Sequence, residues 1–349
     1  MVYYIYCIIF IIKQKTRKVR CALLERSLFM PGFTTHYLFG VQAIKNLEQP
    51  FFKEKIKKHH TVFGLGLQGP DIFFYDLPSY AIYRTNIGSP AHTQDTGKFL
   101  SFLLKSRKLF SSAKEIHIAE SYIAGFIGHY LLDTACHPYV YFKSGNMPND
   151  PSSFGFHVYL EVDIDTAFLW HYKKLLPSEF HPERTIRVNA TERRVIAKIL
   201  HYCYKNVYPE LSVSLATTYR ATFSTQLLCD LLHDPTGKKK ALARRGEKLI
   251  LGYPFVSPLI PSDSLQFYAD PLNLAHRTWK NPWDSTLCSN ASFPDLFLSA
   301  SEEYKACLYR LSKLFSCKKE TLLKTLEEAL LSDLGNNSYH SGLDCSIPS

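Results

Sequence analysis

The chain has 349 residues, of which 46% are apolar and 21% are charged. This length is ample for a sizeable core, and the composition excludes a disordered tail protein, a collagen-like repeat and a small disulfide scaffold. The 41 basic and 31 acidic side chains leave a net charge of +10. Such a balance favours anionic partners, whether nucleic acid, phospholipid head groups or other phosphates, without selecting one of them.

Residues 1–29 carry half of this positive excess. They hold six basic residues against the single acid Glu25, which leaves +5 in this segment and +5 in the rest of the chain. Val2–Ile12 is an unbroken run of eleven apolar residues, too short to span a bilayer as a helix. The positive charges follow this run, whereas a secretory signal places them in front of it. We expect that residues 1–29 are not part of the mature protein and that Met30 is the real start. The alternative is a short anchor at a membrane surface.

The nine cysteines are irregularly spaced, and no C-x-x-C pair occurs among them. The odd number and the spacing argue against both a disulfide framework and a zinc knuckle. Because no convincing export signal precedes them, we expect a cytoplasmic protein, with contact at the periphery of a membrane as an option.

Helical periodicity dominates the chain from Thr34 onward. Thr34 or Thr35 is placed to cap a first helix that runs to Leu47. Gly64–Asp71 indicates a glycine-rich turn that enters a new helix, with Pro70 in its first turn. Further helices are expected over 96–109, 116–136, 156–176, 191–204, 226–233 and 301–331.

Prolines and glycines mark the predicted interruptions. Pro138 is expected to stop the helix over 116–136, Phe142–Phe154 to be a loop, and the proline-rich stretch Tyr253–Pro271 to separate later helices. No strand alternation and no internal repeat is found, so the sequence predicts an all-α, multi-helix bundle. We divide it into the apolar and basic extension 1–29, a metal-binding core over 30–176 and further helices without an assigned function over 177–349.

Two pairs of histidine and carboxylate point to metal chemistry. His129 and Asp133 are four residues apart on one predicted helix, and His157 and Glu161 repeat that spacing on the next. Residues at this spacing project from the same face of a helix. Imidazole and carboxylate pairs on facing helices are a standard way to hold a divalent metal in a bundle core. An unpaired carboxylate in such apolar helices would be costly, and coordination removes that cost.

Three further candidates come from other segments: His36 near a helix start, Asp71 after a tight turn, and His92. In addition, His137 lies one turn after Asp133. Asp95, one turn from His92, either orients that imidazole or faces solvent. The remaining histidines are expected to be satisfied core or surface residues: His59, His60, His117, His171, His181, His201, His233 and His340.

Two later segments are unusual in composition. The basic run Lys238–Lys248 is expected to be a solvated helix face rather than a phosphate or membrane site. Asn273–Asp284 groups two tryptophans with a histidine and an arginine. We expect it to be a structural lid over the bundle, with a wall of the substrate site as the alternative.

The order of these candidates resembles the zinc-dependent phospholipase C family, whose wider superfamily includes the fungal single-strand nucleases. All eight side-chain ligands of that family find a match in order, over roughly residues 31–170. The likeness is carried by Phe33-Thr-Thr-His-Tyr-Leu-Phe-Gly40, Gln68-Gly-Pro-Asp71, Ala91-His92, Gly128-His-Tyr-Leu-Leu-Asp133, His137 and His157-Val-Tyr-Leu-Glu161.

The resemblance implies up to three zinc ions. One would be held by Asp71, His92, His129 and Asp133, and another by His137, His157 and Glu161. A further ion would use His36, Asp133 as a bridge, and the amine and carbonyl of the mature first residue. A start at Met30, with that methionine removed, would make this residue Pro31, five positions before His36. Proline departs from the tryptophan usual in the family.

The function implied is a phosphodiesterase of phospholipase C type, acting on a phospholipid or a related phosphodiester small molecule. Asp71 and Asp133, with a metal-bound water, are the implied catalytic residues. A hydroxide between two zinc ions would attack phosphorus in line, and no protein nucleophile is needed. The absence of a Gly-x-Ser-x-Gly elbow agrees with this expectation. Mixed imidazole and carboxylate ligands suit zinc without excluding iron or manganese.

Three alternatives stay open at this stage. The same metals would serve a nuclease or nucleotidase, which makes nucleic acid a less favoured partner. A zinc-stabilised helical binding protein without turnover is a second alternative. A histidine–aspartate phosphohydrolase is a weaker one, because the only His-Asp dipeptide, His233-Asp234, stands apart from the other candidates.

Overall fold

A computed structural model of the chain describes residues 32–145, 151–250, 252–254, 256–265 and 268–346. The N-terminal extension 1–29 and the predicted terminal ligand Pro31 lie outside these residues. What the sequence predicts for them stays a prediction.

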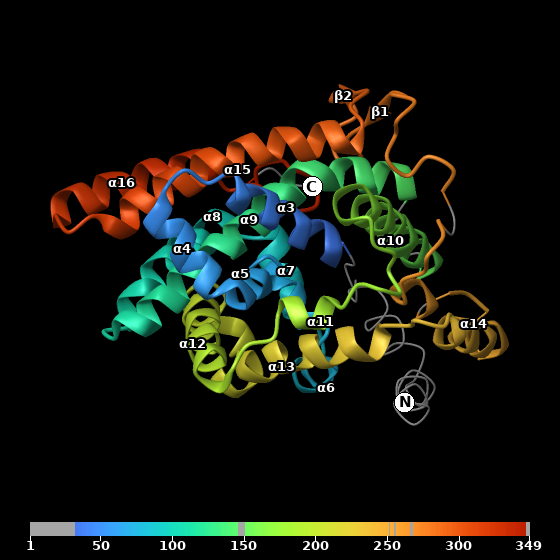
Figure 1. Cartoon of the computed structure of the whole chain (residues 1–349), viewed down its shortest axis with the longest axis horizontal. Helices are drawn as coiled ribbons and strands as arrows, with labels where there is room; N and C mark the ends of the chain where they lie inside the picture. The colour runs from blue at the N-terminus through green and yellow to red at the C-terminus, as the bar shows by residue number, and fades with distance from the viewer. Residues whose placement is uncertain (1–31, 146–150, 251, 255, 266–267, 347–349) are drawn as a thin grey trace.

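Most of the described residues are helical, which confirms the all-α prediction (Figure 1). A single two-residue antiparallel pair is found among them, in which β1 (Trp279–Lys280) faces β2 (Cys288–Ser289). None of the described helices is both long and apolar enough to cross a membrane. The α-helices are α3 (Phe33–Lys45), α4 (Pro50–Lys58), α5 (His60–Gly66), α6 (Leu77–Tyr83), α7 (Gly88–Thr93), α8 (Thr96–Lys105), α9 (Ala113–Ser144), α10 (Pro151–Lys173), α11 (Pro182–Thr185), α12 (Ala190–Val207), α13 (Leu215–Leu232), α14 (Lys238–Ile250), α15 (Phe293–Ser316) and α16 (Glu320–Leu334). The 3₁₀ turns are η1 (Gly69–Phe73), η2 (Ser106–Leu109), η3 (Pro209–Leu211) and η4 (Ser257–Leu259).

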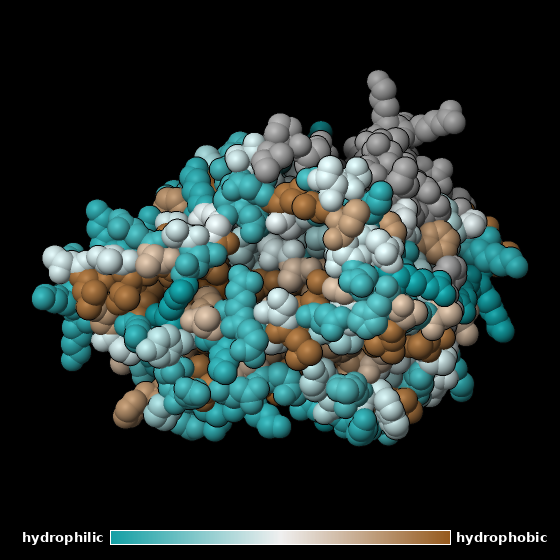
Figure 2. Space-filling model, turned by 90° about the horizontal axis from the view of Figure 1, so that it is seen from above, coloured by the Kyte–Doolittle hydropathy of each residue, from teal (hydrophilic) through white to brown (hydrophobic). Residues whose placement is uncertain are grey.

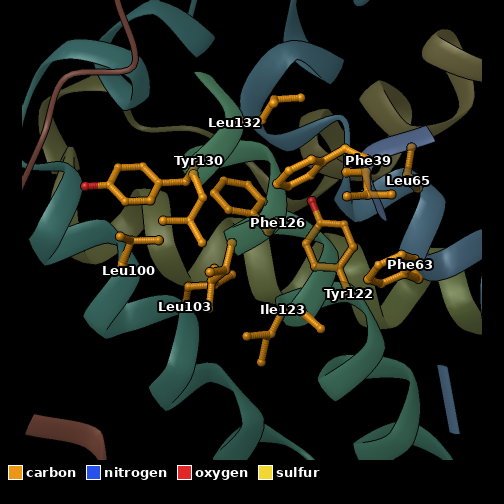
Figure 3. Packing of buried hydrophobic residues seen from close by; sticks show 14 of the residues in the cluster. Phe39, Phe63, Leu65, Leu100, Leu103, Tyr122, Ile123, Phe126, Tyr130 and Leu132 are labelled. Atoms are coloured by element: carbon orange, nitrogen blue, oxygen red, sulfur yellow. The ribbon is translucent and has the colours of Figure 1, made fainter. Parts of the chain in front are cut away.

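Helix α9 is the centre of the molecule. A helix that is apolar on all sides must be buried on all sides, and α9 is enclosed by α3, α5, α10, α12 and α15 (Figure 1). In Figure 3 its side chains Tyr122 and Phe126 lie among Phe39 of α3, Phe63 of α5 and Leu103 of α8. This packing fixes α9 on every side, so the polar residues further along it are also held inside.

Helices α5 and α9 cross at the distance of direct backbone contact. A side chain at Gly125 would lie 2.2 Å from the carbonyl oxygen of Phe63, and one at Gly66 would lie 2.4 Å from that of Tyr122. Glycine is required at both positions because only it permits this approach. The expectation of a turn beginning at Gly64 is wrong, since Gly64–Gly66 belongs to α5. The new element begins at η1, with Pro70 in its first turn as predicted.

The prediction that Pro138 stops a helix is also wrong. Helix α9 continues through Pro138 to Ser144 and ends at Gly145, which has the left-handed conformation. Proline removes the hydrogen bond to the carbonyl four residues earlier, here that of Thr134. Gly342 packs against that carbonyl, because a side chain there would lie 2.6 Å from the Thr134 oxygen. The segment that follows α16 therefore meets α9 at this interruption.

Other predicted boundaries shift by less. The predicted loop over 142–154 is shorter, because Phe142–Ser144 belongs to α9 and α10 begins at Pro151. The helix expected over 301–331 is two helices, α15 and α16, and the one expected from Gln226 begins at Leu215. The capping box of Ser292 and Asp295, which starts α15, is a sequence signal that the prediction missed.

The outer surface shows no single dominant apolar patch on the face drawn in Figure 2. Hydrophilic side chains cover most of it, and small apolar areas lie between them. Scattered exposed apolar residues are normal for a folded protein.

Candidate metal centre

The eight predicted side-chain ligands come together in the interior. They come from five elements: His36 from α3, Asp71 from η1, His92 from α7, then His129, Asp133 and His137 from α9, and His157 and Glu161 from α10. None is more than 6% exposed. Eight polar side chains at this depth need partners of their own.

Asp133 is the hub of the cluster. Its Oδ1 lies 3.0 Å from Nε2 of His36 and 3.4 Å from Nε2 of His137, and its Oδ2 lies 3.1 Å from Nε2 of His129. The rings of His36 and His129 stack at 4.3 Å. One ligand atom from each of His36, His129 and Asp133 lies within 4.8 Å of the other two. These three residues are therefore close enough to hold one metal ion.

A second group of three shares His129. Nε2 of His92 lies 2.9 Å from Oδ1 of Asp71, and Nε2 of His129 lies 3.9 Å from the same oxygen. The ligand atoms of Asp71, His92 and His129 also lie within 4.8 Å of one another. The two groups adjoin through His129, which is an arrangement suited to two neighbouring ions.

Glu161 gathers the remaining histidines. Its Oε1 lies 3.4 Å from Nε2 of His157 and 3.4 Å from Nε2 of His137. His137 therefore stands between Glu161 and Asp133 and links this group to the hub. A cavity of about 20 Å³, lined by His36, Asp133, His137 and Glu161 among others, opens between them. That space is comparable with the volume that one water molecule needs.

The outer nitrogens of the histidines are held by the backbone. Nδ1 of His92 is 2.8 Å from the carbonyl of Gly88, and Nδ1 of His129 is 3.1 Å from that of Leu67. Such bonds fix the ring orientation and leave Nε2 free to coordinate. Gly88 thus has the orienting role considered for Asp95, and Asp95 is instead the residue before α8.

Charge is distributed unequally over the cluster. Burial raises the pKa of Asp133, but the imidazoles of His129, His137 and His36 outweigh it and hold that pKa well below its usual range. Burial raises the pKa of Glu161 to about 8, in spite of His137 beside it, and lowers that of His157 to about 4. For His36, burial lowers the pKa, yet the Asp133 carboxylate beside it raises it overall.

The cluster leaves buried polar atoms without hydrogen-bond partners among the described residues. They include Nε2 of His129, Oδ2 of Asp133, Nε2 of His157 and Oε2 of Glu161. His129 Nε2 and Asp133 Oδ2 are close but not aligned for a hydrogen bond. Buried polar groups are nearly always satisfied, and bound cations would satisfy these four. Imidazole nitrogen and carboxylate oxygen at these positions fit zinc.

The start of α3 is fastened next to this centre. The prediction that Thr34 or Thr35 caps this helix is wrong, because the cap residue is Gly32. The backbone nitrogens of both threonines, and the Thr35 hydroxyl, donate instead to the buried carboxylate of Asp165. Gly32 lies against His36 and Glu161, since a side chain there would be 3.8 Å from the His36 ring and 3.9 Å from Glu161 Oε1. The described chain therefore begins at the edge of the centre.

His340 is the residue of this region that the sequence analysis missed. It was expected to be a satisfied core or surface histidine, yet its Nε2 is buried without a hydrogen-bond partner among the described residues. Its ring centroid lies 5.6 Å from that of His92 and 6.2 Å from that of His137. Burial lowers its pKa well below the usual value, so the ring is neutral. No spacing rule connects residue 340 to residues 36–161, so local sequence contains no signal for this placement.

The aromatic segment over 273–284, expected to be a lid or a wall of the substrate site, packs on α9. Trp283 meets Tyr141 at 4.9 Å between ring centroids, and Trp279 meets Tyr139 at 5.8 Å. The basic run 238–248 is helix α14, but it is not wholly solvated. Lys240 is buried and donates to the carbonyl of Ile260.

Comparison with known proteins places this centre in a family. A model described as zinc dependent phospholipase C matches residues 35–227, a span that extends beyond residue 170 and contains all eight side chains. No curated protein and no solved structure matches the chain. The match covers more than half of the sequence. The chain therefore belongs to the zinc-dependent phospholipase C family.

Proposed function

We propose that this protein is a zinc-dependent phosphodiesterase that hydrolyses a phospholipid, or a related phosphodiester, on the glycerol side. The family indicates phospholipase C activity and a phospholipid substrate in general. The observation that carries the proposal for this chain is the buried cluster, in which two groups of three ligands adjoin through His129. We propose that it holds up to three zinc ions.

Bound zinc would supply an activated water and would withdraw charge from the phosphoryl group. The chain supplies the rest. Asp71 and Asp133 are carboxylates in contact with imidazoles, and the low pKa of Asp133 keeps it ionised as an anchor for cations. The backbone bonds of His92 and His129 fix both rings before substrate arrives. Because the cluster is shielded from bulk water, fixed charges act strongly inside it.

The test is product analysis with zinc-loaded, full-length protein. Phosphatidylcholine vesicles and single-stranded DNA are offered separately, and diacylglycerol, phosphocholine and nucleotides are measured. We expect diacylglycerol and phosphocholine, with loss of both in Asp133→Asn. Nucleotides alone would favour a nuclease, and zinc binding without any hydrolysis would favour a binding protein. Either of these results overturns the proposal.

We also propose a cytoplasmic location with peripheral membrane contact. All cysteines among the described residues are free thiols, as a reducing compartment requires. Cell fractionation with and without a high-salt wash tests this. Recovery only in an exported, oxidised fraction would contradict it.

A further inference from the structure

His340 comes to the centre from a separate part of the chain. It belongs to the segment 336–345, which follows α16 and lies outside the span 35–227 that matches the family. Its ring centroid is 5.2 Å from that of Tyr141, which in turn is 4.6 Å from that of His157. The His340 ring is also 5.6 Å from that of His92 and 6.2 Å from that of His137, so it borders both ligand groups.

The segment is fastened directly to two of the predicted ligands. The backbone nitrogen of Tyr339 donates to the carbonyl of His92 at 2.8 Å, and its carbonyl accepts from Nδ1 of His137 at 2.9 Å. Gly342, with φ of +67°, packs on the Thr134 carbonyl at the Pro138 interruption of α9. The residues on both sides of His340 are thus held by the helices that bear the ligands, so its position is fixed by the fold.

The Nε2 atom of His340 resembles the ligand atoms beside it in its burial and in its hydrogen bonding. Nε2 of His340, Nε2 of His157 and Oε2 of Glu161 are all buried and have no hydrogen-bond partner among the described residues. By contrast, Nδ1 of His92 and Nδ1 of His137 each lie at hydrogen-bond distance from a backbone carbonyl. A nitrogen without a partner at this depth indicates a missing bond to something that is not protein.

The neighbouring ligand group has one position open to a further ligand. The ion at Asp71, His92, His129 and Asp133 would already have four side-chain ligands. His137, His157 and Glu161 offer three, and the fourth ligand of zinc can be water, substrate or protein. The ring separation of His137 and His340 is 6.2 Å, the same as that of His137 and His157. We propose that His340 donates Nε2 as a further protein ligand to the zinc ion held by His137, His157 and Glu161. The C-terminal segment thereby completes a centre that the family-matched region leaves with an open position.

This inference rests on the proposed zinc centre but not on the proposed substrate. It is therefore tested by metal binding in the full chain, independently of hydrolysis. His340→Ala and His340→Gln are compared with His157→Ala, which removes a predicted ligand of the same ion. His201→Ala is the matched control, because His201 is also partly buried and bonds a backbone carbonyl, that of Val213, away from the centre.

The measurements are zinc per chain after equilibration with a competing chelator, and the visible spectrum after Co²⁺ replaces zinc. We expect His340→Ala to weaken retention of one ion at least about tenfold, to change the Co²⁺ spectrum, and to leave the other ions in place. His157→Ala should lose the same ion, so the double variant should lose no further one. His201→Ala should match the unaltered protein.

Wild-type zinc retention together with an unchanged Co²⁺ spectrum in His340→Ala would overturn the inference. If circular dichroism shows that His340→Ala is unfolded, His340→Gln, which keeps the size and polarity of the side chain, gives the same decision. If the unaltered chain binds no zinc, the inference and the proposed function both fall. Normal zinc binding without hydrolysis removes only the proposed function.

Discussion

Asp76 and the carboxylates of the metal centre are all buried, but they differ in how they are satisfied. Asp76 is fully buried and accepts from Nε and Nη2 of Arg220 and from the hydroxyls of Ser79 and Ser224. Asp133 and Glu161 are almost as deeply buried, but each keeps one oxygen without a hydrogen-bond partner among the described residues. At Asp76 the donors are all protein groups, whereas the unpartnered oxygens of Asp133 and Glu161 lie among imidazoles, where a cation fits.

The comparison predicts opposite consequences for removing charge at the two sites. Asp76 should matter for folding, because its partners are protein groups. Asp133 should matter for zinc and turnover, because three imidazoles converge on it and one of its oxygens has no hydrogen-bond partner in the described part of the chain.

The largest expected effect is on turnover in Asp133→Asn. We expect kcat/KM for phosphodiester hydrolysis to fall by about 10²- to 10³-fold or more, because the variant loses the charge that anchors cations at the reacting group. Steady-state hydrolysis of phosphatidylcholine at saturating zinc measures this. Asp76→Asn is the control and should keep its rate within about threefold where it is folded, since Asp76 lies outside the centre. Equal losses in both variants would contradict the distinction between the sites.

Asp76→Asn should instead lower stability. Removing the charge leaves the Arg220 guanidinium, whose side chain is 32% exposed, without its carboxylate. We expect the free energy of unfolding to fall by about 2–3 kcal/mol, at the lower end for a buried ion pair because Arg220 is partly solvated. Denaturant unfolding measures the change, and zinc content should stay at the wild-type value. If Asp76→Asn kept its stability but lost zinc, Asp76 would be a metal-site residue and our structural assignment of it would be wrong.

The pH dependence of the metal-free protein tests Glu161. Its pKa is about 8 in the folded protein, above the usual 4.5, so the unfolded state binds fewer protons between these values. The free energy of unfolding therefore falls as pH rises through this window. Below pH 6.5 the folded pKa of about 4 for His157 opposes this trend, because the unfolded imidazole is protonated there. Between pH 6.5 and 8, Glu161 changes the free energy of unfolding and His157 hardly does.

We expect metal-free protein to lose about 2 kcal/mol of unfolding free energy from pH 6.5 to 8 through Glu161. Glu161→Gln should lack this loss, because the amide does not ionise. Denaturant unfolding of both proteins after chelation, at several pH values in this window, compares the slopes. Parallel curves for the two proteins would show that Glu161 does not titrate in this range.

The smallest expected effect is at the fastening of α3. Thr35→Val removes the hydroxyl that donates to Asp165 at 2.6 Å, while the backbone nitrogens of Thr34 and Thr35 still donate to that carboxylate. We expect a loss of about 1 kcal/mol in unfolding free energy. Thr34→Val is the matched control, because Thr34 contributes only its backbone nitrogen to Asp165. A larger loss in Thr34→Val than in Thr35→Val would contradict this account.

Short-range chemistry made much of the centre predictable. The pairs His129–Asp133 and His157–Glu161 lie on single helices, where a spacing of four residues fixes a common face. The structure keeps each of these pairs within 3.4 Å. His36, Asp71 and His92 lie on other elements, and their order in the chain resembled a family pattern. That resemblance, rather than periodicity, linked them to the helices.

Local rules failed at two places where distant segments meet a helix. Pro138 has the local chemistry of a helix stop, yet α9 continues to Ser144, and Gly342 packs on it beside Pro138. Thr34 and Thr35 have the chemistry of helix caps, yet Asp165 takes their hydrogen bonds from 130 residues away. Neither Gly342 nor Asp165 can be paired with its partner by any spacing rule.

The sequence by itself determined the helical class, the two ligand-bearing helices and the chemistry of the ligands, because these depend on residue type and on contacts within a few residues. Only the tertiary structure decided which carboxylates are satisfied, how His129 joins two groups, and that His340 reaches the centre. Those features depend on backbone contacts such as that of α5 with α9 and that of Tyr339 with His137. Such contacts arise when buried elements pack together, and no short stretch of sequence specifies them.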